Sequence, residues 1–443
     1  MDLPLAAASL FLPFASSRFP IKKKIIAVFC LVSLAFLSEP KVVHIYHDKA
    51  STPALLQMVN YIEQPENDLK IVAWNRYHKH IQGKENFKNT LFTTDWDEIF
   101  KTLTEYKKKY NRLKIIVHFN IYHDYFYKKI YEYFKENLEI AHIYEDASMF
   151  IWRDSSKDNL LHKEDGIKKN LYMWGDPNVL CSGDDPLDRC PAIDWIKSEI
   201  RTIPINFHEL QKKLSASDKK AIFKLAGFDF EKYKNLLSKK PNGIYVLGVA
   251  VNLPLEGAQL AALKDVCQMT PDFQWYYKPH PNRFYIPTEQ VLNHYCPNIK
   301  PLDAHIPFEL LIIGGLKPTK VAGMSSSLFA NLEAKDILAY IQRGKNDEYL
   351  PSLKKVGLLS KNRTYSEEKT LKKLNEMGAF RVSKKWPYSY WMIKINDTKS
   401  CIMHYDQCGQ IIQNSPTEKT IKWDNGNVTK LKHKNAYEWI EVE

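Results

Sequence analysis

An aromatic, β-type run ends at a lysine and a histidine that alternate with prolines, in Trp275-Tyr276-Tyr277-Lys278-Pro279-His280-Pro281. Because proline fixes φ and has no backbone N–H, these prolines predict that a strand ends here. Lys278 and His280 would then lie at the carboxyl edge of a parallel sheet, where open α/β sheets bind ligands. This cationic pair suits an anionic ligand such as a phosphate. Taken alone, the segment fits equally well a strand followed by a proline-rich turn with an incidental histidine.

Small hydroxyl residues follow a short predicted strand at 320–322, in Gly323-Met324-Ser325-Ser326-Ser327. At a helix N-terminus, free backbone N–H groups and the helix dipole attract phosphate, and serine hydroxyls add donors. Ser326 and Ser327 are therefore candidate anion-binding residues. Simple capping is the alternative, since serine is a favoured N-cap residue, although three serines exceed what one cap needs.

Carboxylates stand at the ends of two predicted elements. In Tyr144-Glu145-Asp146-Ala147-Ser148, two adjacent acids follow a predicted strand at 140–144, and one of them could be a general base. Because side chains alternate along a strand, only one of the pair can point into a cleft; an acidic turn or an N-cap is the alternative. Glu309 begins a predicted helix at 308–313, where it could bind ribose hydroxyls or simply stabilise the first turn.

The sequence predicts no metal site and no cofactor. Asp95-Trp96-Asp97 has the Asp-x-Asp spacing of some metal sites, but it lies in the first turn of a predicted helix, which favours capping. His118 and His123 have a possible ligand spacing without a partner cluster. The chain has 7 cysteines and no C-x-x-C, so a zinc site is not expected. In an oxidising compartment, two close pairs could be bridged: Cys181 with Cys190, and Cys401 with Cys408.

Strands and helices alternate along the chain in two series. In the first, strands are predicted at 42–46, 69–73, 113–119 and 140–144, with helices from 53, at 94–106 and at 124–136; residues 155–205 look irregular. In the second, strands at 243–251, 273–278 and 320–322 alternate with helices at 255–265, 308–313 and 326–332. Such alternation predicts parallel sheets.

We therefore expect an α/β protein with two Rossmann-like doubly wound domains that face a cleft. The predicted units are a first domain at 41–205, a second at 206–345, a helical crossover at 346–378 and a small all-β module at 379–443. The crossover contains a helix at 366–377. The β-module is predicted from short aromatic and β-branched runs separated by turn residues.

The composition is that of a soluble globular protein with a special N-terminal segment. The chain has 443 residues and a net charge of +12, which favours anionic partners. Its lysines are scattered and no nucleic-acid-binding motif is present, so nucleic acid is not an expected partner. Three lysines at 22–24 precede an apolar run at 25–37 that is too short to span a bilayer. Residues 1–40 are therefore predicted to be a signal peptide or signal anchor, with membrane association through residues 22–37.

Taken together, the motifs resemble glycosyltransferase family 80, the bacterial β-galactoside sialyltransferases, from about residue 42 to residue 370. Each block is weak alone, but their order and spacing together are specific. The matching blocks are Tyr46-x-Asp48-x-Ala50-Ser51-x-Pro53-Ala54-Leu55, Arg76, His118-Phe119-Asn120-Ile121, Tyr144-Glu145-Asp146-Ala147-Ser148, Lys278-Pro279-His280-Pro281, Phe308-Glu309-Leu310 and Ser326-Ser327-Leu328.

The resemblance implies a GT-B fold and an inverting transfer of sialic acid from CMP-sialic acid to a galactoside hydroxyl of a glycan or lipooligosaccharide. Asp146 would be the general base, and His280 would act on the departing CMP phosphate, so no divalent metal is required. The remaining implied contacts are Ser326 and Ser327 to the phosphate, Glu309 to the ribose, Lys278 to the nucleotide, and Arg76 and Asn120 to the sialyl group.

Three features depart from the family pattern. Ala147 replaces a glycine after the acid pair. Asn252 stands where the family often has a tryptophan that stacks on the acceptor sugar, which leaves acceptor identity and linkage open. The β-module has no counterpart in the family core; its aromatic residues could form a sugar-stacking face or an ordinary core. These residues are Trp386, Tyr388, Tyr390 and Trp391.

Two other functions remain as alternatives, and the side of the membrane is open. A related CMP-sugar transferase, for instance one that uses Kdo, would need the same anion site. A non-catalytic glycan-binding protein on the same scaffold is the second alternative. The charge distribution around the apolar run would place residues after 40 outside the cytoplasm, whereas a CMP-sugar made inside bacterial cells favours the cytoplasmic face.

Overall fold

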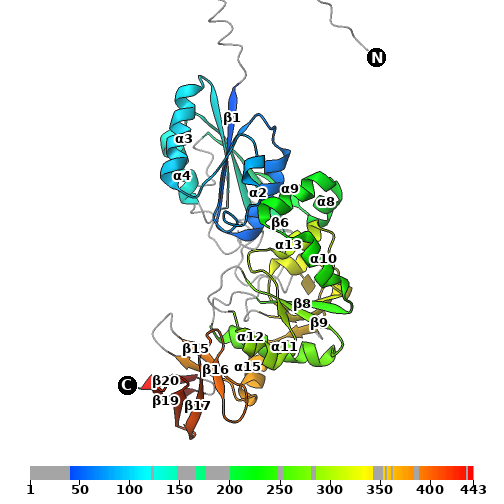
Figure 1. Ribbon diagram of the computed structural model, residues 1–443, viewed down its shortest axis with the longest axis vertical. Coiled ribbons are helices and arrows are strands. Elements are labelled where there is room, and N and C mark those ends of the chain that lie inside the picture. The colour runs from blue at the N-terminus through cyan, green and yellow to red at the C-terminus, as the bar shows by residue number, and fades with distance from the viewer. Residues whose placement is uncertain are drawn as a thin grey trace, which may run out of the picture.

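Two parallel sheets and a barrel follow one another along the chain (Figure 1). The computed structural model describes residues 40–120, 124–146, 166–174, 200–247, 253–280, 286–342, 353–354, 357–360, 363–383, 389–435 and 438–442. The predicted signal or anchor segment, including residues 22–37, therefore lies outside the described residues apart from Pro40. Within the described ranges, no helix combines the length and apolarity needed to cross a membrane.

The first sheet has seven parallel strands in the order β3-β2-β1-β4-β5-β6-β7. These are β1 (Lys41–Asp48), β2 (Leu69–Trp74), β3 (Thr90–Phe92), β4 (Leu113–Phe119), β5 (Leu138–Asp146), β6 (Lys168–Trp174) and β7 (Arg201–Ile205). The order reverses between β1 and β4, so their carboxyl ends form the crevice where such sheets bind ligands. Residues 155–205 were predicted to be irregular, which is wrong for the described parts that form β6 and β7; residues 155–165 and 175–199 lie outside the described residues.

The helices of the first domain cover both faces of this sheet. They are α2 (Ser51–Glu63), α3 (Trp96–Lys109) and α4 (Asp124–Phe134). Asp95 is the N-cap of α3, and its side chain accepts a hydrogen bond from the backbone N–H of Asp97, so capping accounts for this Asp-x-Asp pair. Helix α2 begins two residues before Pro53, which was predicted to stand in its first position.

The second sheet has six parallel strands in the order β10-β9-β8-β11-β12-β13. These are β8 (Asn242–Val246), β9 (Gln274–Lys278), β10 (Lys300–Pro301), β11 (Lys320–Met324), β12 (Ile337–Ile341) and β13 (Thr364–Tyr365). Its helices are α11 (Leu253–Met269), α12 (Glu289–Tyr295) and α13 (Phe308–Ile313). The helix predicted from Ser326 is a short 3-10 helix, η7 (Ser327–Asn331), followed by another, η8 (Ala334–Asp336). The order reverses between β8 and β11.

Three helices that the sequence analysis did not identify connect the two sheets. They are α8 (Phe207–Lys213), α9 (Ala216–Ala226) and α10 (Phe230–Ser238), and each begins with a side-chain cap, from Asn206, Ser215 and Asp229 respectively. Their apolar side chains belong to one buried cluster that also contains residues of both sheets, including Tyr46 and Ile244. The two doubly wound domains therefore share part of their core.

The C-terminal module is a closed barrel of seven strands. These are β14 (Phe380–Ser383), β15 (Tyr390–Lys394), β16 (Ser400–Ile402), β17 (Cys408–Asn414), β18 (Glu418–Trp423), β19 (Val428–Asn435) and β20 (Glu438–Val442), and β14 pairs with β20 to close the ring. Trp391 is fully buried against α11 and α15 (Glu367–Glu376), which anchors the barrel to the second domain. Trp391 and Tyr390 are thus core residues; Trp386 and Tyr388 lie outside the described residues.

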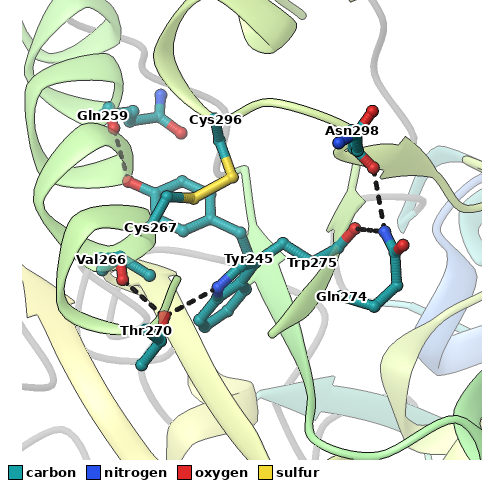
Figure 2. Close-up of a disulfide and its surroundings, with 9 residues drawn as sticks. All are labelled: Tyr245, Gln259, Val266, Cys267, Thr270, Gln274, Trp275, Cys296 and Asn298. Carbon is teal, nitrogen blue, oxygen red and sulfur yellow. Dashed lines mark hydrogen bonds between the residues drawn. A yellow bond between two sulfur atoms is a disulfide. The ribbon is translucent and has the colours of Figure 1, made fainter. Parts of the chain in front are cut away.

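Two disulfides lie within the described part of the chain. Cys267 on α11 is bonded to Cys296, the C-cap residue of α12, as Figure 2 shows. Cys401 is bonded to Cys408, its directly opposite partner on neighbouring barrel strands. The second pair was anticipated and the first was not; the predicted pair Cys181 and Cys190 lies outside the described residues.

Candidate active site

Lys278 ends strand β9 and is almost completely buried at the carboxyl edge of the second sheet, as predicted. Its ammonium group donates hydrogen bonds to the carbonyl oxygens of Pro279 (2.5 Å) and Ala304 (3.2 Å). Burial lowers the pKa of Lys278 to about 7, although the carboxylates of Glu309 and Asp303 oppose that shift. A lysine with such a pKa gains positive charge when an anion approaches, because the anion stabilises the protonated form.

His280 follows two residues later and is partly exposed. Burial, Lys278 and Arg76 lower the pKa of His280 to about 3. In the ligand-free protein the imidazole is therefore neutral near pH 7. A phosphate bound beside it would raise this pKa and favour the imidazolium form, which can donate a proton or a hydrogen bond to a leaving oxygen.

Arg76 brings charge from the first domain to this site. It follows β2 and donates a hydrogen bond from Nε to the carbonyl oxygen of Lys49. Its charge contributes to the lowered pKa of both Lys278 and His280. The cationic groups of the two domains therefore act on each other, and their mutual repulsion favours an anionic ligand between them.

Glu309 links the domains through a hydrogen bond. It lies in the first turn of α13, is 4% exposed, and accepts a hydrogen bond from Oγ1 of Thr52 in the first turn of α2 at 3.3 Å. Its charge also opposes the loss of a proton from Lys278. Glu309 thus does more than stabilise the first turn of α13, because it belongs to the same cluster as Lys278.

Asn120 and Glu145 form a second polar cluster at the carboxyl edge of the first sheet. Both are 1% exposed. The Asn120 amide donates to the carbonyl oxygen of Tyr144 (2.8 Å) and to Oε2 of Glu145 (2.9 Å). Glu145, one member of the predicted acid pair, is therefore buried and hydrogen-bonded to Asn120. The other, Asp146, is the last residue of β5; its side chain lies outside the described part, as do Ala147 and the whole of Asn252.

Ser326 follows β11 at the carboxyl edge of the second sheet, where β8 lies between β11 and β9. Its side chain accepts a hydrogen bond from the backbone N–H of Leu328 at 3.4 Å, so it caps η7. Val246 of β8 pairs with Lys278 on one side and with Gly323 on the other. The serine segment and Lys278 therefore flank the same strand end. The Ser327 side chain lies outside the described part.

Asp48 is a site residue that the sequence analysis did not select. It ends β1 at the strand-order reversal, is 1% exposed, and accepts hydrogen bonds from the Ala50 backbone N–H (2.7 Å) and the Gln57 amide (3.0 Å). Burial raises its pKa to about 8 despite the backbone donors and the charge of Arg76. An acid at the end of a largely buried strand, inside the first matching block, was the available signal.

The arrangement provides cations for an anionic ligand and carboxylates for hydroxyl groups. Lys278, His280, Arg76 and Glu309 act on one another at one locus, whereas Asn120 belongs to the crevice of the first sheet. No group of three or more histidine, cysteine or acidic side chains is placed to hold a metal ion in the part of the chain that the structure describes.

Comparison with known proteins bears on the same segment. A family model described as sialyltransferase PMO188 matches residues 263–362, which include Lys278, His280, Glu309, Ser326 and Ser327. The chain resembles the bacterial sialyltransferases. The predicted resemblance is thus confirmed. No curated protein sequence matches the chain.

Solved bacterial sialyltransferases share the fold. An α/β-galactoside α2,3-sialyltransferase from Photobacterium phosphoreum matches with a TM-score of 0.57 and 19% identity, over 75% of this chain and 100% of that one. A 2,6-sialyltransferase from Photobacterium sp. JT-ISH-224, solved with CMP and lactose, matches with a TM-score of 0.57 and 14% identity, over 74% and 78%. A sialyltransferase from Photobacterium damsela matches with a TM-score of 0.53 and 19% identity, over 74% and 81%. The predicted GT-B fold of two Rossmann-like domains is confirmed.

Proposed function

We propose that the chain is a sialyltransferase that moves sialic acid from CMP-sialic acid to a galactoside hydroxyl. The observation that carries this proposal is the family-model match over residues 263–362, which contain the buried Lys278 and the neighbouring His280. One of the similar bacterial sialyltransferases was solved with CMP and lactose. A nucleotide phosphate is the anion that a cluster of Lys278, His280 and Arg76 suits.

The proposed mechanism divides the chemistry between the two sheets. Asp146 at the end of β5 accepts the proton of the acceptor hydroxyl, while His280 stabilises the phosphate oxygen that leaves the anomeric carbon. Glu145 is engaged by Asn120, which favours Asp146 as the base. Attack from the side opposite the leaving group inverts the anomeric centre. Protonation of His280 and the charge of Lys278 neutralise the departing CMP, so we propose that no metal is required.

The remaining roles are those that the family resemblance implies. Glu309, at the N-terminus of α13, accepts hydrogen bonds from the ribose, and Ser326 and Ser327 bind the phosphate at the carboxyl edge of the second sheet. Arg76 and Asn120 contact the sialyl group from the first domain. Asn252 contributes to the acceptor site, and the linkage formed depends on that part of the site.

The decisive experiment supplies both candidate donors to the purified full-length protein. We expect CMP release and a sialylated product with CMP-sialic acid and lactose, and neither with CMP-Kdo. The Asp146→Ala variant should lose transfer, whereas Glu105→Ala, an exposed acid on α3, should retain it. Transfer from CMP-Kdo alone would favour the Kdo transferase. Binding of glycans without CMP release from either donor would favour a non-catalytic glycan-binding protein.

We also propose that residues 22–37 attach the chain to a membrane and that the domains after residue 40 lie on its oxidising side. Structural disulfides persist in oxidising compartments and are rare in the cytosol, and Cys267–Cys296 and Cys401–Cys408 are both bonded. Fractionation with and without residues 1–40, combined with alkylation of free thiols before reduction, tests this. Soluble full-length protein with every cysteine alkylated would contradict it.

A further inference from the structure

The outer face of the last barrel strands carries exposed lysines among exposed aliphatic side chains. Lys422 on β18 and Lys430 and Lys432 on β19 are exposed and form no ion pair with any described residue, whereas the neighbouring Lys434 pairs with Glu438. The aliphatic members are Ile412, Val428 and Ile440, which are 53%, 54% and 41% exposed. We call these six residues the Lys-aliphatic face.

Strand register places five of these side chains in one patch, and the sixth, Ile412, lies at a bulge in β17, which pairs with β18. Val428 lies directly opposite Lys422, and Ile440 lies directly opposite Lys432. Directly opposed residues of antiparallel strands have Cβ atoms about 5 Å apart on the same side of the sheet. From Val428 to Lys432 the strand rises only about 13 Å. The lysines and the aliphatic side chains are therefore interleaved.

The orientation of this face follows from what fills the barrel. Ile421, Leu431 and Trp439, which alternate with the exposed positions, are 6% exposed or less and pack in the barrel interior. Because side chains alternate along a strand, the intervening positions point away from the interior. The exposed aliphatic residues are thus no part of the barrel core.

Little negative charge offsets the lysines. Glu418, opposite Lys432, is the acidic side chain at the outward positions of β18. Glu438 on β20 is engaged by Ser383, Arg381 and Lys434. The face is therefore net positive. Figure 1 places the barrel at the end of the molecule away from β1, and none of the six residues belongs to the candidate active site.

We propose that the Lys-aliphatic face docks on an anionic lipid bilayer. Lysines alone would suit any polyanion, but exposed isoleucine and valine side chains among them gain only where they can leave water. A bilayer interface accepts both groups at once, since ammonium groups meet anionic headgroups while short aliphatic side chains enter the acyl boundary. The proposal concerns a second membrane contact and is independent of residues 22–37.

Vesicle flotation of the full-length protein tests the charge requirement. We expect Lys422→Glu/Lys430→Glu/Lys432→Glu to bind phosphatidylcholine–phosphatidylserine vesicles at least about tenfold more weakly than wild type. The matched control Lys101→Glu/Lys108→Glu/Lys220→Glu reverses exposed charges on α3 and α9 and should bind like wild type. Vesicles of phosphatidylcholine alone measure any binding that is due to residues 22–37. Both triple variants should bind these vesicles equally. Equal binding of both triple variants to the anionic vesicles would overturn the proposal.

A second variant separates a bilayer from a soluble polyanion. Ile412→Ser/Val428→Ser/Ile440→Ser keeps the lysines, so it should lose vesicle binding in high salt, where charge attraction is screened, yet keep any affinity for dextran sulfate. Unchanged vesicle binding together with tight dextran sulfate binding would replace the bilayer with a soluble polyanion. Thermal unfolding of each variant verifies that the barrel is intact.

Discussion

Nε2 of His118 lies 3.1 Å from Nδ1 of His44 in the middle of the first sheet. This contact continues in both directions, since His44 Nε2 is 3.3 Å from Oδ2 of Asp68 and His118 Nδ1 is 3.0 Å from the Tyr144 hydroxyl. His142 stacks on His118 from the next strand. With both imidazoles neutral, His44 donates to Asp68, His118 donates to His44, and the Tyr144 hydroxyl donates to His118, so each hydrogen bond is donated toward Asp68.

The three buried histidines His44, His118 and His142 make the fold sensitive to acid. Burial lowers the pKa of His44 and of His142 to about 4 and places that of His118 well below its usual range. Below about pH 6.5 these histidines become protonated in the unfolded chain but stay neutral in the folded chain. The free energy of unfolding is therefore highest above pH 6.5 and decreases as the pH falls toward 4. Each such histidine contributes up to about 1.4 kcal/mol of lost stability per pH unit.

Urea unfolding at pH 7, 6 and 5 measures this dependence. His142→Phe keeps a ring in the stack but removes one titrating group, so it should make the fall in unfolding free energy with pH shallower. His433→Phe, an exposed position on the barrel, is the matched control and should leave it unchanged. The interpretation is wrong if His142→Phe and wild type have the same pH dependence.

Binding of CMP should draw a proton into the site. The pKa of His280 is about 3 and that of Lys278 about 7 in the free protein, and a phosphate beside them raises both. We therefore expect net proton uptake near pH 7 and tighter CMP binding as the pH falls from 8 to 6. Calorimetry in buffers of different ionisation enthalpy measures the uptake. His280→Asn should reduce it; uptake equal to that of wild type would place the titrating group elsewhere.

Glu309→Gln should weaken nucleotide binding at neutral pH. Loss of this carboxylate lowers the pKa of Lys278 further, because Glu309 is the largest influence that keeps that lysine protonated. We expect about a tenfold higher KM for the donor at pH 7.5, partly recovered at pH 6, on the scale of about 1.4 kcal/mol for one pKa unit. Glu333→Gln is the control, since this glutamate is exposed and pairs with Lys317 and Lys335 instead of acting on Lys278. A defect with no pH dependence would mean that Glu309 acts only through the ribose.

Gly323→Ala should destabilise the second domain. Gly323 has φ +141°, and a Cβ there would lie 2.3 Å from the carbonyl oxygen of Val246 on the neighbouring strand. Backbone strain and overlap together should cost about 3–5 kcal/mol of unfolding free energy. Gly426→Ala, with φ +88° and nothing within 4 Å, should cost only about 1 kcal/mol. Chemical denaturation measures the unfolding free energy of both variants. Equal losses would show that the close approach of β11 to β8 does not add to the cost of a Cβ at Gly323.

Removal of one disulfide should destabilise the second domain without abolishing its fold. The Cys267–Cys296 bond closes a segment with a sequence separation of 29, for which chain-entropy arguments give about 3.6 kcal/mol. Cys267→Ala/Cys296→Ala should therefore unfold at lower denaturant concentration than wild type. In the variant, Trp275 Nε1 still has the Thr270 hydroxyl as its acceptor (Figure 2). Equal stability of the oxidised wild type and the variant would contradict the prediction.

The central strands of both sheets were predictable because burial on both faces makes them predominantly apolar. Every residue of β2 and of β8 is buried. Strands β6 and β7 were missed because they lie toward the edge, where polar residues and even Pro204 are tolerated. Their strand character depends on the neighbour that offers hydrogen bonds, and no local pattern encodes that neighbour.

The chemical groups of the candidate site were likewise visible in the sequence, but their relations were not. Lys278 and His280 stand out because prolines end their strand. By contrast, the bond from Thr52 to Glu309 joins residues 257 positions apart, and the effect of Arg76 on His280 acts between domains. Neither relation has a signature in residue spacing.

The sequence by itself determined the two alternating α/β series, the C-terminal β-module, the resemblance to bacterial sialyltransferases, and the side chains that end β9 and begin α13. Local hydrogen bonding and the alternation of apolar residues suffice for these features. Only the tertiary structure decided that Glu145 is engaged by Asn120, that Asp48 is a buried acid at the reversal of strand order, and that Lys278 has a pKa of about 7. Desolvation and contacts between domains arise only when distant segments pack together.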